Sequence, residues 1–218
     1  ARTLASRPDV EANGDGAVAG ENLSVAVRVQ PQPDGAIALP RAAISWGEAR
    51  IDASGSMQAD GRPDLSAEAK IPSLEPLGAL LGQALRGAIV AQAAAHPAGD
   101  GIAAKLTLEA TQLVLPGARA ARIGIEATAE GAMTAPVLDA RIALQGVAAG
   151  GLVTGGSVTL RGPLDALAIA AALDGADHAL RAEARAELPA RVRLSALSAR
   201  WQTESLRLAS PATVMLDP

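Results

Sequence analysis

Apolar and polar residues alternate one by one along much of this 218-residue chain, and this alternation limits the structures that the chain can adopt. Successive side chains of a β-strand point to opposite faces, so the alternation predicts strands with one apolar face and one polar face. A helix would instead repeat its apolar residues every three or four positions. The runs that alternate most clearly span residues 23–30, 102–109, 139–145 and 191–195, with shorter runs at 44–46, 123–126, 158–161, 206–208 and 214–216.

Glycine, proline and aspartate separate the alternating runs. Asp-Gly pairs tolerate the positive φ angles of tight turns, so between two apolar runs they favour β-hairpins. A succession of such hairpins predicts an all-β fold built as an elongated antiparallel meander. The interruptions that we expect to be turns are Pro33-Asp34-Gly35, Asp60-Gly61, Gly99-Asp100-Gly101, Pro116-Gly117, Gly150-Gly151, Gly155-Gly156 and Asp174-Gly175.

One segment departs from the alternation. Ser73 can cap a helix, Pro76 is acceptable in a first turn, and five leucines between positions 74 and 85 follow helical spacing. Arg86 suits the last turn of a helix and Gly87 the position after its end. We therefore expect a short amphipathic helix from about Leu74 to Arg86.

The expected organisation is one continuous elongated domain, with a β-meander over 1–72, a helical segment over 73–87 and a second β-meander over 88–218. The alanine-rich stretch 164–173 is compatible with a helix on propensity alone. It follows Pro163, in a looser copy of the motif Pro-x-Leu/Val-x-Ala that begins at Pro63 and Pro136, and proline can begin a strand. We therefore expect a strand over 164–173.

Because the chain begins at Ala1 and ends directly after a strand-like run, we also expect it to be a piece of a longer protein.

The composition narrows the possible functions. The chain has no Phe, Tyr or Cys, and Trp46 and Trp201 are its only aromatic residues, so its apolar surface comes from Leu, Val, Ile and Ala. Such a surface offers few polar groups to a specific ligand, although a genome biased toward Ala and Arg codons is an alternative cause. The net charge of -4 and the interspersed charges argue against nucleic-acid binding. The absence of cysteine excludes disulfides and thiolate metal sites and agrees weakly with an oxidising compartment.

Residues with catalytic or metal-binding chemistry do not form a recognisable motif. Both histidines lie in segments that we expect to be polar loops, and the glutamates are expected to point outward from a strand. The serines lack a nucleophile elbow, and the paired glycines lack the ending of a phosphate-binding loop. We expect no enzyme activity, no cofactor and no metal. The residues considered are His96, His178, Glu183, Glu187, Ser157 and Ser195.

Three parts of the sequence resemble the repetitive middle region of the TamB family of translocation and assembly module subunits, within the wider AsmA-like group. The first is 47–55 (GEARIDASG) followed by 63–67 (PDLSA), and the second is 74–87 (LEPLGALLGQALRG). The third is 191–200 (RVRLSALSAR) followed by 206–216 (LRLASPATVML). The motifs consist of Gly, Leu and Pro at loose spacings, and the resemblance extends over most of the chain.

The resemblance implies a sheet curled into a half-pipe, or β-taco, with an apolar inner face. It implies a periplasmic location, as part of a protein anchored in the inner membrane by a segment not evident here. It implies transport of phospholipid between the inner and outer membranes, assembly and secretion of outer-membrane proteins such as autotransporters, or both. The implied partners are phospholipid acyl chains and, through other parts of the full protein, an outer-membrane assembly-barrel partner.

The alternating runs supply the continuous apolar face that such a half-pipe requires. An aliphatic lining would hold acyl chains at roughly 0.8 kcal/mol per buried methylene without specific hydrogen bonds. Trp46 and Trp201 are expected either to pack at the lip of the trough or to fill the ends of the core. The competing hypothesis is a purely structural β-solenoid, such as an adhesin or passenger segment, whose interior is filled by its own side chains. The expected groove-lining residues are Val25, Val27, Val29, Leu106, Leu108, Ile142, Leu144, Val192 and Leu194.

Overall fold

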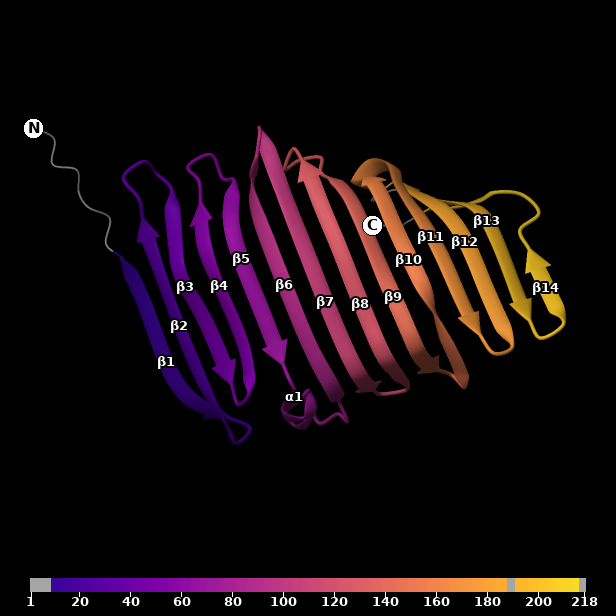
Figure 1. Cartoon of the computed structure of the whole chain (residues 1–218), viewed down its shortest axis with the longest axis horizontal. Coiled ribbons are helices and arrows are strands. Elements are labelled where there is room, and N and C mark those ends of the chain that lie inside the picture. Colours follow the sequence, from indigo (N-terminus) through magenta and orange to yellow (C-terminus); the bar gives the residue numbers. More distant parts are fainter. Residues whose placement is uncertain (1–8, 188–190, 216–218) are drawn as a thin grey trace, which may run out of the picture.

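The computed structural model, which describes residues 9–187 and 191–215, is one long antiparallel sheet with a short α-helix at one margin (Figure 1). Strands β1 to β14 lie side by side in sequence order, and β15 pairs with β13. The predicted all-β meander is confirmed, and the sheet remains open between β1 and β14. The strands are β1 (Val10–Val18), β2 (Glu21–Pro31), β3 (Ile37–Trp46), β4 (Ala49–Met57), β5 (Pro63–Ile71), β6 (Arg86–Ala98), β7 (Gly101–Leu115), β8 (Ala118–Gly131), β9 (Val137–Ala149), β10 (Leu152–Pro163), β11 (Leu167–Gly175), β12 (His178–Glu187), β13 (Arg191–Trp201), β14 (Glu204–Arg207) and β15 (Ala212–Met215).

Most of the expected turns and strands are found, with three corrections. Gly155 and Gly156 do not form a turn but lie inside β10, where the backbone of β11 approaches Gly156 so closely that a Cβ would overlap the carbonyl of Ala172. Asp174-Gly175 ends β11, and the turn follows it. The stretch 164–173 is a strand from residue 167 onward, but its first three residues form a 3₁₀ turn. Of the run 214–216, the last residue lies outside the described residues.

The helix is shorter than predicted. Helix α1 spans Glu75–Leu81, and Gly82 ends it in the left-handed conformation at φ 65°. The expected end at Arg86 is wrong because Gly82 supplies the left-handed conformation expected of Gly87 five residues earlier, and β6 then begins at Arg86. Leu74 rather than Ser73 occupies the N-cap, but the Ser73 hydroxyl still accepts a hydrogen bond from the Glu75 backbone N–H at 3.2 Å.

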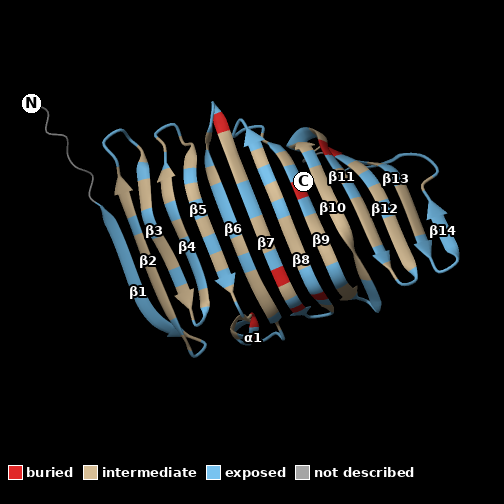
Figure 2. Cartoon of the chain, in the orientation of Figure 1, coloured by how far each residue is buried: buried red, intermediate tan, exposed pale blue. Residues whose placement is uncertain are grey.

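Few of the described side chains are buried, and the largest group of buried ones lies beneath α1 (Figure 2). Leu74, Ala110, Leu113 and Ala120 form this group, and each is less than a tenth exposed. Strict alternation would turn Leu113 away from Ala110, because the two residues are three positions apart in the strand. A β-bulge at Gln112, whose φ is 52°, adds the residue that returns Leu113 to the face covered by the helix.

Close approach between strands makes some glycines necessary. Gly55 in β4 has a φ of 141°, and a Cβ there would overlap the Asp64 carbonyl of β5. We expect Gly55→Ala to lower the free energy of unfolding by about 1–3 kcal/mol, because both the φ angle and the strand spacing oppose a side chain. Urea unfolding would measure the loss. Gly14→Ala in β1 is the control, since a Cβ there has open space, and an equal loss in both variants would contradict this explanation.

Candidate functional site

The most prominent surface of the molecule is one continuous apolar face of the sheet. Residues paired directly across an antiparallel ladder have side chains on the same side, so the register shows which residues share a face. Starting at Val25, each partner in turn is apolar, without interruption, across twelve strands. This row consists of Val25, Ile44, Ile51, Ala69, Ala91, Leu108, Ile125, Ile142, Val158, Ala171, Ala182 and Leu197.

A second row runs parallel to the first and is equally apolar. It consists of Val27, Ala42, Ala53, Ala67, Ala93, Leu106, Ala127, Ala140, Leu160, Ile169, Ala184 and Leu194. We call the side of the sheet that carries both rows the apolar face and the opposite side the polar face.

All nine residues expected from the sequence to line a groove lie on the apolar face. Six of them belong to the two rows, and Leu144 is paired with Ile123 beside them. Val29 is opposite Val10 at the far end of β2, and Val192 is opposite Ala186. The register therefore brings together, on one side of a single sheet, residues that are up to 169 positions apart in the sequence.

Charged residues separate cleanly between the two faces. Among the described strand residues, the apolar face carries charge only at Glu21 and Glu204, each the first residue of its strand. The polar face carries the other charged strand residues, several of them in ion pairs. The Arg122 guanidinium lies 2.6 Å from the Glu109 carboxylate, and the Arg181 guanidinium lies 2.9 Å from the Asp174 carboxylate.

The apolar face is only partly covered by the chain itself. Ile44 and Ile51 are each 42% exposed, and Leu106 is 38% exposed. Side chains of this kind are normally removed from water in a protein interior, and an exposed apolar surface of this extent is typical of a binding surface.

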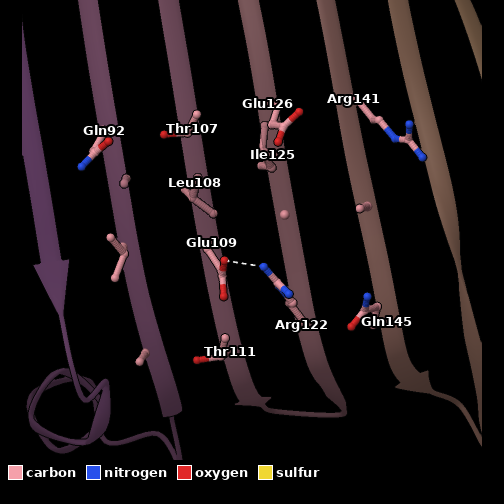
Figure 3. Close-up of a pocket in the computed structure, with 15 residues that line it drawn as sticks. Gln92, Thr107, Leu108, Glu109, Thr111, Arg122, Ile125, Glu126, Arg141 and Gln145 are labelled. Carbon is pink, nitrogen blue, oxygen red and sulfur yellow. Dashed lines mark hydrogen bonds and ion pairs between the residues drawn. The ribbon is translucent and has the colours of Figure 1, made fainter.

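The polar face has its own hollows, which the sequence did not predict. One of them, of about 730 Å³, lies over β6 to β9 and is lined mainly by polar-face residues such as Gln92, Thr107 and Glu109 (Figure 3). Its walls are long side chains that rise from a floor of Ala, Gly and Thr. The Glu109–Arg122 ion pair lies within it, and Glu126 and Arg141 add one further charge of each sign to the lining.

The tryptophans occupy two ends of the apolar face. Trp46 ends β3, is half-buried, and donates its indole N–H to the Val18 carbonyl at 3.0 Å. Trp201 ends β13 and stacks on His178, with 5.6 Å between the ring centroids. Because β3 and β13 run in the same direction, both indoles lie along the margin of the sheet that carries α1 (Figure 1).

The residues with catalytic potential are dispersed. The expectation that both histidines lie in loops is wrong: His96 lies in β6, where Ala103 is its partner, and His178 begins β12. Both positions follow an alternating strand pattern that the flanking Gly and Asp residues obscure. Glu183 and Glu187 lie in β12, and the Ser195 hydroxyl donates to the Glu183 carbonyl at 3.0 Å.

The ionisable groups of the described residues do not assemble into a reactive centre. Across residues 9–187 and 191–215, no three His, Asp or Glu side chains converge as they would around a metal ion. The pKa of Asp60 is lowered because the Arg62 backbone N–H, and then its guanidinium, hydrogen-bond to the carboxylate. This pair belongs to a turn, where Arg62 also donates to the Gly99 carbonyl at 2.5 Å, so its role is to link two turns. The helices in this part of the chain fall short of the length and hydropathy that a membrane-spanning helix needs.

A second kind of site lies where α1 overhangs the apolar face. A partly open hollow of about 600 Å³ lies between the helix and strands β2 to β4. The helix contributes Pro76, Leu77 and Leu80 to its wall. The strands contribute Leu23, Ile44, Trp46 and Ile51.

No family model, no curated protein and no solved structure matches this chain. The geometry of the two faces is therefore the basis for assigning a function.

Proposed function

We propose that this chain is a non-catalytic scaffold segment of a TamB-like envelope protein, whose apolar face carries phospholipid acyl chains across the periplasm. The observation that carries the proposal is the uninterrupted apolar row from Val25 to Leu197, which extends across the sheet at right angles to the strands. An acyl chain that lies along this row would contact aliphatic side chains at every strand of the row.

The energetics support a sliding ligand. Each methylene removed from water contributes about 0.8 kcal/mol, and the gain is the same at each point along an aliphatic surface. Ala and Leu side chains offer no hydrogen bonds that would fix the ligand in one position. Neighbouring strands are about 4.8 Å apart, so the twelve strands of the row provide a path of roughly 50 Å.

The same face is also suited to the second function implied by the resemblance. An unfolded outer-membrane strand alternates apolar and polar side chains, and its apolar side fits this surface as an acyl chain does. We propose outer-membrane protein assembly and secretion as the alternative use of the face, with the cargo decided by experiment.

The proposal is tested by isolating the protein with its native cargo. We expect native mass spectrometry and lipid extraction to find phospholipid bound to the purified chain. A photo-crosslinking residue at Leu106, on the apolar face, is expected to label lipid, while one at Lys105, the adjacent residue on the polar face, is expected to remain unlabelled. A folded, lipid-free protein with no labelling at either position would refute the lipid function and leave the purely structural segment as the explanation. Labelling of outer-membrane protein at Leu106 would select the alternative cargo.

A further inference from the structure

Helix α1 is anchored to the sheet on one side only. Leu74 and Leu77 pack with Leu113 and its neighbours on β7 and β8, in the one cluster of buried residues beneath the helix. The Glu75 carboxylate also lies 3.3 Å from the Arg86 guanidinium at the start of β6. The flank of α1 that faces β2 to β4 lacks a comparable buried cluster among the described residues, and the 600 Å³ hollow lies there instead.

This hollow differs from the rest of the apolar face because it is covered from two sides. A ligand on the open sheet loses contact with water on one side, whereas a ligand beneath α1 lies between the sheet and Leu77 and Leu80. The transfer of each methylene from water is therefore more complete in the hollow. Its volume lies within the range of about 300–1,000 Å³ that is common for small-molecule sites.

The side chains that line the hollow favour an aliphatic ligand over a polar one. Its two uncharged polar side chains, Trp46 and Ser73, already make hydrogen bonds to the backbone of the chain. A polar group placed inside would lose its hydration without gaining these partners, which is unfavourable.

The charged residues that line the hollow indicate which lipid head group it would favour. Glu21 and Glu48 line it, and neither forms a salt bridge with a described residue. Arg50 also contributes lining atoms, but its pairing with Ser45 and Lys70 places it on the polar face. The lining therefore has two carboxylates and one guanidinium, and its net negative charge favours a cation.

We propose that the hollow between α1 and strands β2 to β4 holds one aliphatic chain of a lipid whose head group carries a positively charged amine. The choice of an aliphatic ligand rests on the proposed function. The hollow adds a defined location, a stoichiometry of one chain and a preference for an amine-bearing head group over a purely anionic one.

Fluorescence of Trp46 gives a direct test, because bromine atoms on a lipid chain quench an indole that they contact. The full chain with Trp201→Leu leaves Trp46 as the only fluorophore of this kind. We expect a brominated lysophosphatidylethanolamine to quench it with one-to-one saturation. A lysophosphatidic acid with the same chain is expected to bind about five-fold more weakly. Equal affinities would overturn the head-group preference, and an absence of quenching would overturn the site.

Two matched substitutions on helix α1 test whether the aliphatic chain of the lipid lies in the hollow. Leu80 lines the hollow and is 52% exposed, while Leu81 does not line it and is 57% exposed, so the fold should tolerate a glutamate at either position. We expect Leu80→Glu to weaken quenching at least ten-fold and Leu81→Glu to leave it unchanged. Equal effects of the two substitutions would overturn the location.

The double change Glu21→Gln with Glu48→Gln should remove the preference for the amine head group, and a preference that persists would overturn its assignment to these carboxylates.

The outcomes separate this inference from the proposed function. Labelling at Leu106 without quenching of Trp46 would remove the site beneath α1 and leave lipid transport standing. Quenching of Trp46 without labelling at Leu106 would support the site and refute transport along the open face.

Discussion

Replacement of Ile125 by glutamate is expected to reduce phospholipid binding by the open face at least ten-fold. Ile125 lies near the middle of the apolar row, between Leu108 of β7 and Ile142 of β9. A carboxylate covered by acyl chains must either lose its hydration or take up a proton, and either requires more than the roughly 1.4 kcal/mol that corresponds to a ten-fold change. Because Ile125 is only half-buried in the free protein, the sheet itself should tolerate the change.

The control for Ile125→Glu adds the same charge to the same strand on the other side. Thr128 is exposed on the polar face of β8, where Lys105 and Asp139 are its partners. We expect Thr128→Glu to leave the amount of co-purified phospholipid unchanged, as measured by quantitative lipid extraction. If both variants lost lipid equally, net charge rather than the apolar face would govern binding.

Replacement of Leu113 by alanine is expected to lower the free energy of unfolding by about 2–4 kcal/mol, which is the loss typical of a leucine removed from a well-packed site. Leu113 is 8% exposed and lies in the cluster that joins α1 to β7 and β8. A fold with so few buried side chains has little other packing to compensate. Urea unfolding would measure the change.

Leu106→Ala is the matched control for Leu113→Ala. Leu106 lies on the same strand and the same face, but it is 38% exposed, so its truncation removes less buried surface. We expect a loss below about 1 kcal/mol. Similar losses at the two positions would show that the cluster beneath α1 is no more important to stability than the open face.

Strands are predicted best from the sequence where large apolar residues alternate with polar ones. Val25, Val27 and Val29 differ sharply from their polar neighbours, and the strand that contains them was found as expected. Strand β6 lies almost wholly in the expected meander over 88–218, but no alternating run marks it because alanine stands on both of its faces: Ala93 lies on the apolar face and Ala94 on the polar face. Alanine carries too little hydrophobic contrast for a period of two to be visible.

The site was predictable in part. The groove-lining residues could be expected on one face because each lies in an alternating run. The bulge at Gln112 could not be predicted, since nothing in the local sequence requires an extra residue there. In the structure it brings Leu113 into the cluster beneath α1. The hollow beneath the helix depends on where α1 is placed on the sheet, which the helical spacing of its leucines does not specify.

The order of the strands also determines how such a sheet is made. Every strand from β2 to β14 hydrogen-bonds to the strand before it in the chain, so each new ladder closes only a short loop. Low contact order of this kind favours rapid folding, and the sheet can lengthen one hairpin at a time while the chain is still being synthesised. At each stage the last strand formed presents an unpaired edge that accepts the next strand, and the same edge accepts a strand from another molecule if it arrives first. Each internal edge is therefore exposed only until the following hairpin closes, whereas the outer edges at the two ends of the sheet stay open after folding is complete.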